Sequence, residues 1–268
     1  MKTWFITGTS KGFGRVWAEA ALERGDQVVA TARNLDSIAD LAERYPDTAL
    51  TVTLDVTDRD AVLAAVAQAK DRFGRIDIAI NNAGFGVFGT VEEVSDAQAR
   101  AQMDTNVFGA LSVTQAVLPI MREQGAGHII QVSSVGGVHA FPNLGIYHAS
   151  KWALEGFSQS LAAEVAGFGI KVTLVEPGGY GTDWGTASAV HADPNPAYQP
   201  LRDAMAARRG STPQGDPVAT GPVILQLVDM DQPPLRFFLG KGLAQMIRAE
   251  YDNRLTEWDT HAELSQQA

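Results

Sequence analysis

Short apolar runs alternate with longer segments of helical periodicity over the first 175 residues. The apolar runs lie at residues 3–7, 27–32, 49–54, 76–81, 128–133 and 171–175, and the helical segments between them include 13–24, 35–44 and 58–73. In the last segment Asp58 is a candidate N-cap, followed by an apolar stripe of Ala61, Val62, Ala65, Val66 and Ala69. This alternation predicts a parallel sheet with helices on both faces.

The pattern breaks between residues 178 and 217, where Gly, Pro, Asn and Ala interrupt any sustained period. Within a compact domain such a stretch is typical of a lid over an active site. A helical run resumes at Val218, followed by a short strand at 236–239 and an amphipathic segment with Tyr251 and Trp258. No linker separates this tail, so we expect one domain over residues 1–268, in which the tail completes the sheet edge and part of the pocket.

The composition fits a globular α/β domain and narrows the chemistry. The chain has 268 residues, of which 45% are hydrophobic and 19% charged. A formal charge of -10 disfavours a nucleic-acid binder held by phosphate contacts. There is no cysteine and the five histidines lack metal-binding spacing, so we expect no metal site. The first apolar run ends at once in a glycine turn, so neither a signal peptide nor a membrane span fits, and we expect a cytoplasmic protein.

A glycine-rich turn joins the first strand to the first helix in "TGTSKGFG". Glycines let a backbone approach a pyrophosphate closely, and a helix N-terminus offers free N–H groups and a favourable dipole. A tight turn without a ligand is the alternative, and the strand before and helix after it favour the phosphate site. The candidate cofactor contacts here are Gly8, Ser10, Lys11, Gly12, Phe13 and Gly14.

The end of the second strand bears on the choice of cofactor. NAD-binding sites usually present an acidic residue there to the ribose 2'-hydroxyl, whereas this chain has Ala32 and Arg33. Arg33 and Lys11 would attract a 2'-phosphate, so we predict NADP(H) in preference to NAD(H). The alternative is that both are ordinary surface charges.

Tyr147 and Lys151 stand four residues apart in "YHASK", within a run that is typical of a helix, so both side chains can project from one face. Taken alone, they could be an exposed surface pair. A nearby ammonium, helped by a cationic nicotinamide, also favours a phenolate and lowers the pKa of a tyrosine from its usual value of about 10. Ser134 ends the apolar run "HIIQVSS" and points away from Ser133, because side chains alternate along a strand.

The chain resembles the short-chain dehydrogenase/reductases in an ordered set of motifs. They are "TGTSKGFG", "LDVTD" at 54–58, "NNAG" at 81–84, "TNVFG" at 105–109, "VSSVGG" at 132–137, "YHASK", and "VEPGGYGT" at 175–182. The resemblance covers about two thirds of the chain. It implies a doubly wound parallel sheet of the Rossmann type with about seven strands, and a nicotinamide cofactor across the carboxyl ends of those strands.

The resemblance also implies further cofactor contacts. Two positions match residues at the adenine, three match the turn that supports the adenosine side and the central strand, and three match the segment beside the nicotinamide. Each could also serve backbone turn geometry alone. In that order they are Asp55 and Val56; Asn82, Ala83 and Gly84; and Pro177, Gly178 and Thr182.

Four residues match the catalytic tetrad of the family. Carbonyl reduction leaves negative charge on oxygen, so the site must donate a proton or a strong hydrogen bond. The resemblance makes Tyr147 the acid/base, Lys151 its electrostatic modifier and a ligand of the nicotinamide ribose, and Ser134 the partner of the substrate oxygen. Asn106 matches the residue that distorts its helix and holds a water in a proton relay, although alone it could be a cap or turn residue.

An apolar or aromatic substrate would suit the residues that flank the catalytic segments, and these could equally be core or lid packing. The texture of 133–161 resembles the hydroxysteroid and retinol dehydrogenase branch. Family members often pair through the helices after Asn106 and after Tyr147, which implies a homodimer or homotetramer. The candidate pocket residues are Phe85, Phe88, His139, Phe141, Tyr180 and Trp184.

The predicted function is therefore an NADP(H)-dependent oxidoreductase that interconverts an alcohol and a ketone or aldehyde. One alternative is a silent cofactor-binding sensor on the same fold, which would have no need of the acid/base. A second is halohydrin dehalogenation, whose catalysts replace the glycine turn and the lysine that this chain retains.

Overall fold

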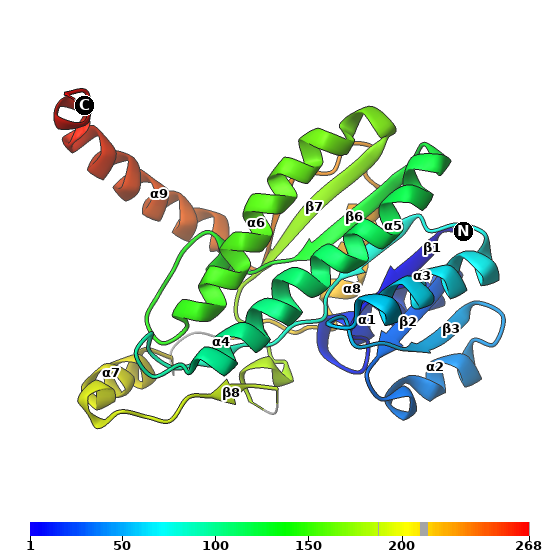
Figure 1. The fold of residues 1–268 in the computed structure, drawn as a ribbon, viewed down its shortest axis with the longest axis horizontal. Helices are drawn as coiled ribbons and strands as arrows, with labels where there is room; N and C mark the ends of the chain where they lie inside the picture. The colour runs from blue at the N-terminus through cyan, green and yellow to red at the C-terminus, as the bar shows by residue number, and fades with distance from the viewer. Residues whose placement is uncertain (187, 210–213, 268) are drawn as a thin grey trace.

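The computed structural model describes residues 1–186, 188–209 and 214–267. Over these residues seven parallel strands form one sheet in the order β3-β2-β1-β4-β6-β7-β9 (Figure 1). All six predicted apolar runs are strands, and the short strand predicted near the C-terminus completes the sheet edge. The strands are β1 (Thr3–Ile6), β2 (Gln27–Ala32), β3 (Ala49–Thr53), β4 (Ile78–Asn81), β6 (Gly127–Val132), β7 (Ile170–Pro177) and β9 (Arg236–Leu239).

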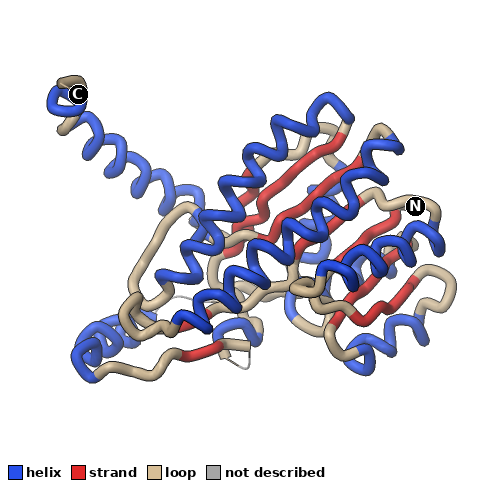
Figure 2. The backbone as a smooth tube through the Cα atoms, viewed as in Figure 1, coloured by secondary structure: helices blue, strands red, loops and turns tan. Residues whose placement is uncertain are grey.

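Helices cover both faces of the sheet, as the alternation predicts (Figures 1 and 2). One apolar cluster lies between the sheet and α1 (Gly12–Glu23), α2 (Ala39–Arg44) and α8 (Thr220–Asp229). The other lies under α3 (Arg59–Phe73), α5 (Ala110–Gln124) and α6 (Gly145–Val165). Successive β1 side chains serve opposite clusters, since Trp4 joins the first and Phe5 the second. The fold is thus a single doubly wound α/β domain of the Rossmann type.

Local sequence signals set several element boundaries. The Asp58 side chain accepts a hydrogen bond from Ala61 N at 3.0 Å, so the predicted N-cap of α3 is confirmed. Gly74, with φ +77°, ends that helix in the left-handed conformation that glycine adopts readily. The segment predicted as a helix at 35–44 starts instead as a 3-10 turn over Leu35–Ile38, because Asn34 accepts from Asp36 N and holds a tight turn.

The predicted lid at 178–217 contains more regular structure than its composition indicates, and residues 187 and 210–213 lie outside the described residues. β8 (Val190–His191) pairs in parallel with β5 (Val87–Phe88), and α7 spans Gln199–Arg209. The expectation that no sustained period survives here is wrong for α7. Asn195 accepts from Ala197 N and starts the 3-10 turn Pro196–Tyr198 that leads into the helix, and Pro200 lies in its first turn, where no backbone N–H is needed.

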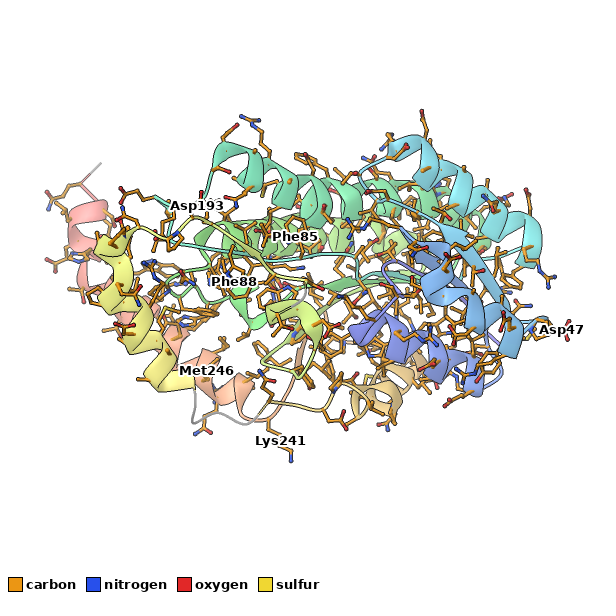
Figure 3. All side chains as sticks on the ribbon, turned by 90° about the horizontal axis from the view of Figure 1, so that it is seen from below. Asp47, Phe85, Phe88, Asp193, Lys241 and Met246 are labelled. Carbon is orange, nitrogen blue, oxygen red and sulfur yellow. The ribbon has the colours of Figure 1, made fainter. Side chains whose placement is uncertain are left out.

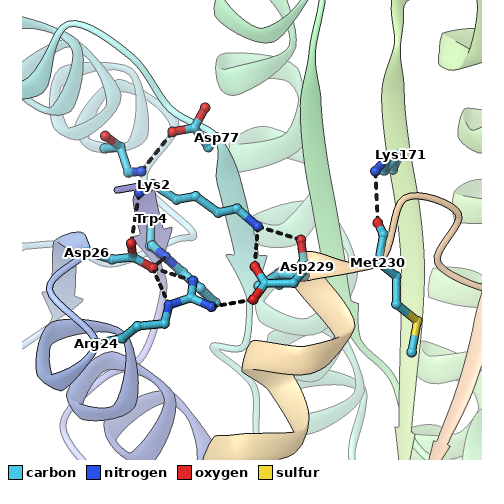
Figure 4. A network of polar contacts seen from close by, with 10 residues as sticks. Lys2, Trp4, Arg24, Asp26, Asp77, Lys171, Asp229 and Met230 are labelled. Carbon is cyan, nitrogen blue, oxygen red and sulfur yellow. Dashed lines mark hydrogen bonds and ion pairs between the residues drawn. The ribbon is translucent and has the colours of Figure 1, made fainter.

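A network of polar side chains lies at the amino ends of β1 and β2 (Figure 4). Asp26, 4% exposed, accepts from Lys2 N at 2.8 Å and from Trp4 Nε1 at 2.9 Å, and it forms an ion pair with Arg24. Lys2 and Arg24 also reach Asp229 at the end of α8. The network ties α8 to β1, and these charged side chains line a shallow cavity of about 300 Å³. The candidate chemistry lies at the opposite edge.

The C-terminal helices project from the body (Figure 1). α9 (Leu243–Thr260) buries Ile247 near its start, whereas Leu255 and Trp258 farther along are 51% and 62% exposed. The remaining helices are α4 (Asp96–Met103) and α10 (Ala262–Ser265). Among the described residues, none of the helices combines the length and apolar character that crossing a membrane would take.

Candidate active site

The glycine turn is shaped by close backbone contact. Gly8 and Gly12 have φ of +71° and +61°, which favour glycine. A Cβ on Gly14 would lie 2.4 Å from Gly8 O and 2.4 Å from Asn82 Nδ2, so only glycine fits there. Lys11 is the N-cap of α1, and because its ammonium has no acceptor to cap them, the first-turn N–H groups remain available to an anion. These features fit the pyrophosphate of a dinucleotide.

Side chains around that turn fix it to β4. Asn82 Nδ2 donates to Thr7 O and to Gly8 O, each at 2.9 Å, and Thr7 Oγ1 accepts from the N–H groups of Asn82 and Ala83 at 3.0 Å. Phe13 stacks on Trp17 with ring centroids 5.3 Å apart, so its side chain belongs to the core side of the turn. Ser10 and Lys11 are exposed at the tip.

Asn106 lies in a π-helical segment, Asp104–Gly109, so the local helix distortion implied by the resemblance is present. Its side chain is buried, accepts from Phe85 N at 3.1 Å, and donates to Phe85 O and Ser150 Oγ at 3.0 Å each. A Cβ on Gly84 would lie 3.0 Å from Asn106 Oδ1 and 3.7 Å from Lys151 Nζ. The segment after β4 therefore connects the glycine turn to the catalytic candidates.

Ser134, Tyr147 and Lys151 converge at the carboxyl end of β6. Tyr147 and Lys151 are only 6% and 7% exposed, which excludes the surface-pair alternative. Lys151 Nζ donates to Val132 O at 2.8 Å and lies 5.8 Å from the centre of the Tyr147 ring. Ser134 is hydrogen-bonded to Tyr147 and accepts from Gly136 N at 3.0 Å, whereas Ser133 is directed away, as strand alternation predicts.

Burial dominates the electrostatics of Tyr147 and Lys151. Burial raises the pKa of Tyr147 to about 12, against the opposing effect of its hydrogen bond with Ser134. Burial likewise lowers the pKa of Lys151 to about 8, partly offset by the charge of Glu155. Lys151 alone therefore does not lower the tyrosine pKa, because the effect of burial prevails, and the lowering by lysine and cationic nicotinamide together stays a prediction. A further positive charge beside the phenol is needed to bring its pKa down.

Two aromatic side chains of the predicted pocket pack against Tyr147. Trp184 lies with its ring centre 4.8 Å from that of Tyr147 and 5.2 Å from that of Phe88. Phe85 is held through its backbone by Asn106 and Gln102. Figure 3 shows Phe85 and Phe88 in the interior of the view, away from the surface positions of Asp47 and Lys241.

Tyr180, in contrast, is not brought to Tyr147. Its ring lies edge-on to Phe13 at 5.0 Å, and a Cβ on Gly215 would lie 2.5 Å from Tyr180 Cε1. The residue therefore packs between the glycine turn and the end of the predicted lid. Between the two aromatic residues, Thr182 N donates to Tyr180 O and a 3-10 turn begins at Asp183, so Tyr180 and Trp184 face different ends of the site.

Phe141 and His139 lie on the segment before α6, which His148 holds in place. His148 Nε2 accepts from Phe141 N at 3.3 Å, so Nδ1 carries the proton and donates to Gly136 O at 3.0 Å. His139 Nδ1 is 3.5 Å from Glu250 Oε1 on α9, so the C-terminal helix borders this segment. Phe141 also lines a groove of about 310 Å³ together with residues of 90–92 and α7.

The remaining cofactor candidates flank the glycine turn. Arg33 is exposed at the end of β2. Burial raises the pKa of Asp55, but hydrogen bonds from Thr57 and the charge of Arg33 outweigh it, so the net pKa is lowered. Val56 packs on Gly109 of the π-helical segment. Asp183 Oδ2 is 3.4 Å from Lys11 Nζ.

The segment after β7 closes the other side. Pro177 is buried at the end of the strand, and a Cβ on Gly178 would lie 2.9 Å from Leu243 of α9. Thr182 caps the turn that carries Asp183 and Trp184, and it lies beside Gly12, where a built Cβ would be 4.0 Å from Thr182 Cγ2. The start of α9 therefore completes this wall.

Residues 2–192 match the family described as short chain dehydrogenase. The chain belongs to the short-chain dehydrogenases. Oxidoreductase BOA17 from Botryotinia fuckeliana is 43% identical over 243 residues, which are 89% of this chain and 89% of that protein. The crystal structure of a short-chain dehydrogenase from Streptomyces avermitilis is 38% identical, with a TM-score of 0.91 over 100% of this chain and 98% of that one.

A gluconate 5-dehydrogenase from Burkholderia cenocepacia, solved with NADP and tartrate, is 28% identical, with a TM-score of 0.78 over 91% of this chain and 95% of that chain. Structural neighbours have been solved with NAD as well as with NADP. This short-chain dehydrogenase is accordingly an oxidoreductase, and the likeness does not separate NAD from NADP.

Sequence reasoning missed several buried polar residues of this short-chain dehydrogenase. Gln102 accepts from Val87 N and donates to Phe85 O, and so holds the segment after β4 alongside Asn106. Glu155 and Glu176 are buried beside Ser133 and Lys151. The signal that could have found Glu176 is a carboxyl group within the apolar strand "LVEP", where an acidic residue needs a partner. Within the described part of the chain, no group of three or more His, Cys, Asp or Glu could hold a metal ion.

Proposed function

We propose that this short-chain dehydrogenase is an NADP(H)-dependent oxidoreductase that interconverts an alcohol and a ketone or aldehyde by hydride transfer. The observation that carries the proposal is the convergence of Ser134, buried Tyr147 and buried Lys151 at the end of β6, next to a glycine turn that fits a dinucleotide. When bound, the cofactor supplies or accepts the hydride, and its oxidised form carries positive charge.

The protein's own residues manage the proton. Because the pKa of Tyr147 is raised to about 12, the phenol is protonated near neutrality and can donate its proton to the carbonyl oxygen during reduction. Ser134 donates a hydrogen bond to the same oxygen. In the oxidation direction a phenolate is needed, and the Lys151 ammonium together with the charge of the oxidised cofactor favours it. Asn106 positions the proton relay through its fixed backbone contacts.

The preference for NADP(H) rests on charge at the end of β2. Arg33 is exposed there and Lys11 at the tip of the glycine turn, where both can approach a 2'-phosphate. Asp55, the nearby carboxylate, is held by Thr57 N and Oγ1 at 3.0 Å and 2.7 Å. In Arg33→Asp the ratio of kcat/KM for NADPH to kcat/KM for NADH should fall by about 10- to 100-fold, and an unchanged ratio would contradict the assignment.

We propose an apolar or aromatic small-molecule substrate. Trp184 and Phe88 form an aromatic wall at Tyr147, and Phe141 lies at the outer groove. Residues 178–217 serve as the lid, since Trp184 and β8 lie on this segment and contact the site.

We also propose a homodimer or homotetramer that pairs through α5 and α6, in the cytoplasm, where a reduced nicotinamide pool is maintained. The outer face of α6 exposes Ala149 and Gly156, small residues that let helices approach closely, while Arg254 of α9 lies over the ring of Trp152 on the same face. Light scattering after size exclusion gives the molar mass, and a strict monomer would refute the pairing.

A panel of ketones, aldehydes and alcohols, followed by absorbance at the nicotinamide band with NADPH and NADH, tests the function. The parent should oxidise or reduce cofactor with at least one apolar substrate. Tyr147→Phe should bind cofactor but lose turnover, and Lys151→Ala should lose both turnover and cofactor affinity. Turnover by Tyr147→Phe at the parent rate would end this mechanism, and cofactor binding without any turnover would favour a sensor.

A further inference from the structure

A buried acidic pair lies behind the catalytic residues. Glu155 on α6 is 5% exposed, and Glu176 on β7 is fully buried. Arg236 on β9 contacts both, with Nε 3.0 Å from Glu155 Oε2 and 3.7 Å from Glu176 Oε1. The pair stands next to the site, because a Cβ on Gly137 would meet both Ser133 Oγ, at 2.5 Å, and Glu155 Oε1, at 3.2 Å.

If both Glu155 and Glu176 were ionised, several buried oxygen atoms of this cluster would have no hydrogen-bond donor. Glu155 Oε1, both oxygens of Glu176 and the hydroxyl of Ser133 are buried without a hydrogen-bond partner among the described contacts. Two adjacent buried anions beside one half-exposed arginine would be costly, because charges removed from water need close partners. One proton placed between the carboxyl groups supplies a donor and removes the repulsion.

We propose that Glu155 and Glu176 share one proton, with Glu176 as the acid and Glu155 as the carboxylate, and that Glu155 thereby acts as a positioning residue that keeps Lys151 charged. This inference rests on the proposed function, in which the Lys151 ammonium assists Tyr147. Glu176 O–H donates to Glu155 Oε1, while Glu155 Oε2 accepts from Arg236.

The geometry decides which carboxyl group holds the charge. Glu155 has the shorter contact with Arg236 and lies one helical turn after Lys151. Glu176 has the longer contact and no exposure. Burial first, and the charge of Glu155 second, raise the pKa of Glu176 to about 8, so it holds its proton at neutrality. The Glu155 charge opposes the effect of burial on Lys151 and favours its ammonium form.

The charged and titratable groups that face Glu155, among the described residues, come from three elements. Lys151 lies on its own helix, Glu176 on β7 and Arg236 on β9. β6 and the turn after it contribute Ser133 and Gly137, which carry no charge at neutral pH. Removing the Glu155 charge therefore leaves Lys151 without its nearest anionic support.

Infrared difference spectroscopy of the protein without substrate tests the shared proton independently of turnover. The parent should show the carbonyl stretch of a protonated carboxyl group at pH 7, and the band should disappear as the pH rises above about 8. Glu176→Gln should abolish it, and Glu164→Gln, an exposed change on the same helix, should leave it. Glu155→Gln should lower the pH at which it disappears, because the repelling charge is gone. Absence of the band in the parent, or its survival in Glu176→Gln, overturns the proposal.

The pH dependence of kcat/KM for alcohol oxidation tests the effect on Lys151. Glu155→Gln should move the acidic limb to higher pH by about half a unit to one unit, because a weaker ammonium raises the pKa of Tyr147. Glu176→Gln, which imitates the protonated acid, should leave the limb within about 0.2 units of the parent. Equal shifts in both variants, or loss of rate at every pH with an unmoved limb, would show a structural role only. A Tyr147→Phe variant that still turns over would instead refute the proposed function and leave the infrared result standing.

Discussion

Gly14→Ala gives a direct test of the cofactor turn, because its geometry leaves no room for a methyl group. The added Cβ would lie 2.4 Å from Gly8 O, a backbone atom that cannot rotate away, and 2.4 Å from Asn82 Nδ2. Asn82 Nδ2 would have to give up its hydrogen bonds to Thr7 O and Gly8 O, both 2.9 Å long. The substitution must therefore move the turn or strain it.

The expected loss follows from these contacts. Overpacking costs about 1–3 kcal/mol and each weakened hydrogen bond about 0.5–1.5 kcal/mol, so about 3 kcal/mol is a reasonable total. If the folded protein keeps the strain, Tm falls by about 6–12 °C. If the turn relaxes, cofactor binding must restore it, and affinity falls by about 100-fold. The two losses together should account for the total.

Thermal unfolding and fluorescence titration with NADPH, carried out on the same preparations, measure both losses. Gly167→Ala is the matched control, since a Cβ at Gly167 meets nothing within 4 Å and the residue does not have a positive φ. This control should retain parent Tm and affinity. If Gly14→Ala matched Gly167→Ala in both measurements, the reasoning about the turn would be refuted.

Two further predictions concern stability and pH. Burial raises the pKa of Asp26, but hydrogen bonds from Lys2, Arg24 and Trp4 outweigh it, so the net pKa is lowered. The ionised Asp26 therefore stabilises the folded protein above about pH 4, and this stabilisation is lost as the pH falls. Asp26→Asn should cost about 2 kcal/mol in urea unfolding at pH 7 and progressively less below pH 4, and a pH-independent cost would contradict this. Burial lowers the pKa of His128 to about 3, so the parent should lose about 1.4 kcal/mol per unit as the pH falls below about 6.5. His128→Gln should remove about 2 kcal/mol of that loss between pH 6.5 and 5, and parallel stability curves would count against it.

The sheet was predictable because its signals are local. The strand "TWFIT" carries three successive apolar residues, Trp4, Phe5 and Ile6, which is typical of a strand buried on both faces, and Asp58 marks the start of its helix as an N-cap. α7 was not predictable from periodicity, since Pro196 and Pro200 disrupt the pattern while their places at a helix start are compatible with it.

In the candidate site, too, the features that depend on neighbouring residues were predictable and those that depend on the path of the chain were not. Gly8, Gly12 and Gly14 stand close together in sequence and their backbone demands can be inferred there. The packing partner of a loop side chain cannot be inferred from sequence, because it depends on the path of the backbone. Trp184 contacts Tyr147, whereas Tyr180, four residues earlier, packs on Phe13. The net pKa of Tyr147 also depends on burial by distant segments, which one helical turn of sequence does not reveal.

Residues 182–184 touch both halves of the site. Thr182 lies beside Gly12, Asp183 contacts Lys11, and Trp184 lies on Tyr147. A dinucleotide phosphate that pairs with Lys11 would compete with Asp183 for that charge, and Trp184 belongs to the same 3-10 turn as Asp183. We therefore expect a compulsory order of addition, in which the cofactor binds first and opens the space over the tyrosine. Product-inhibition patterns report that order, so steady-state kinetics can test the consequence of the 3.4 Å contact between Lys11 and Asp183.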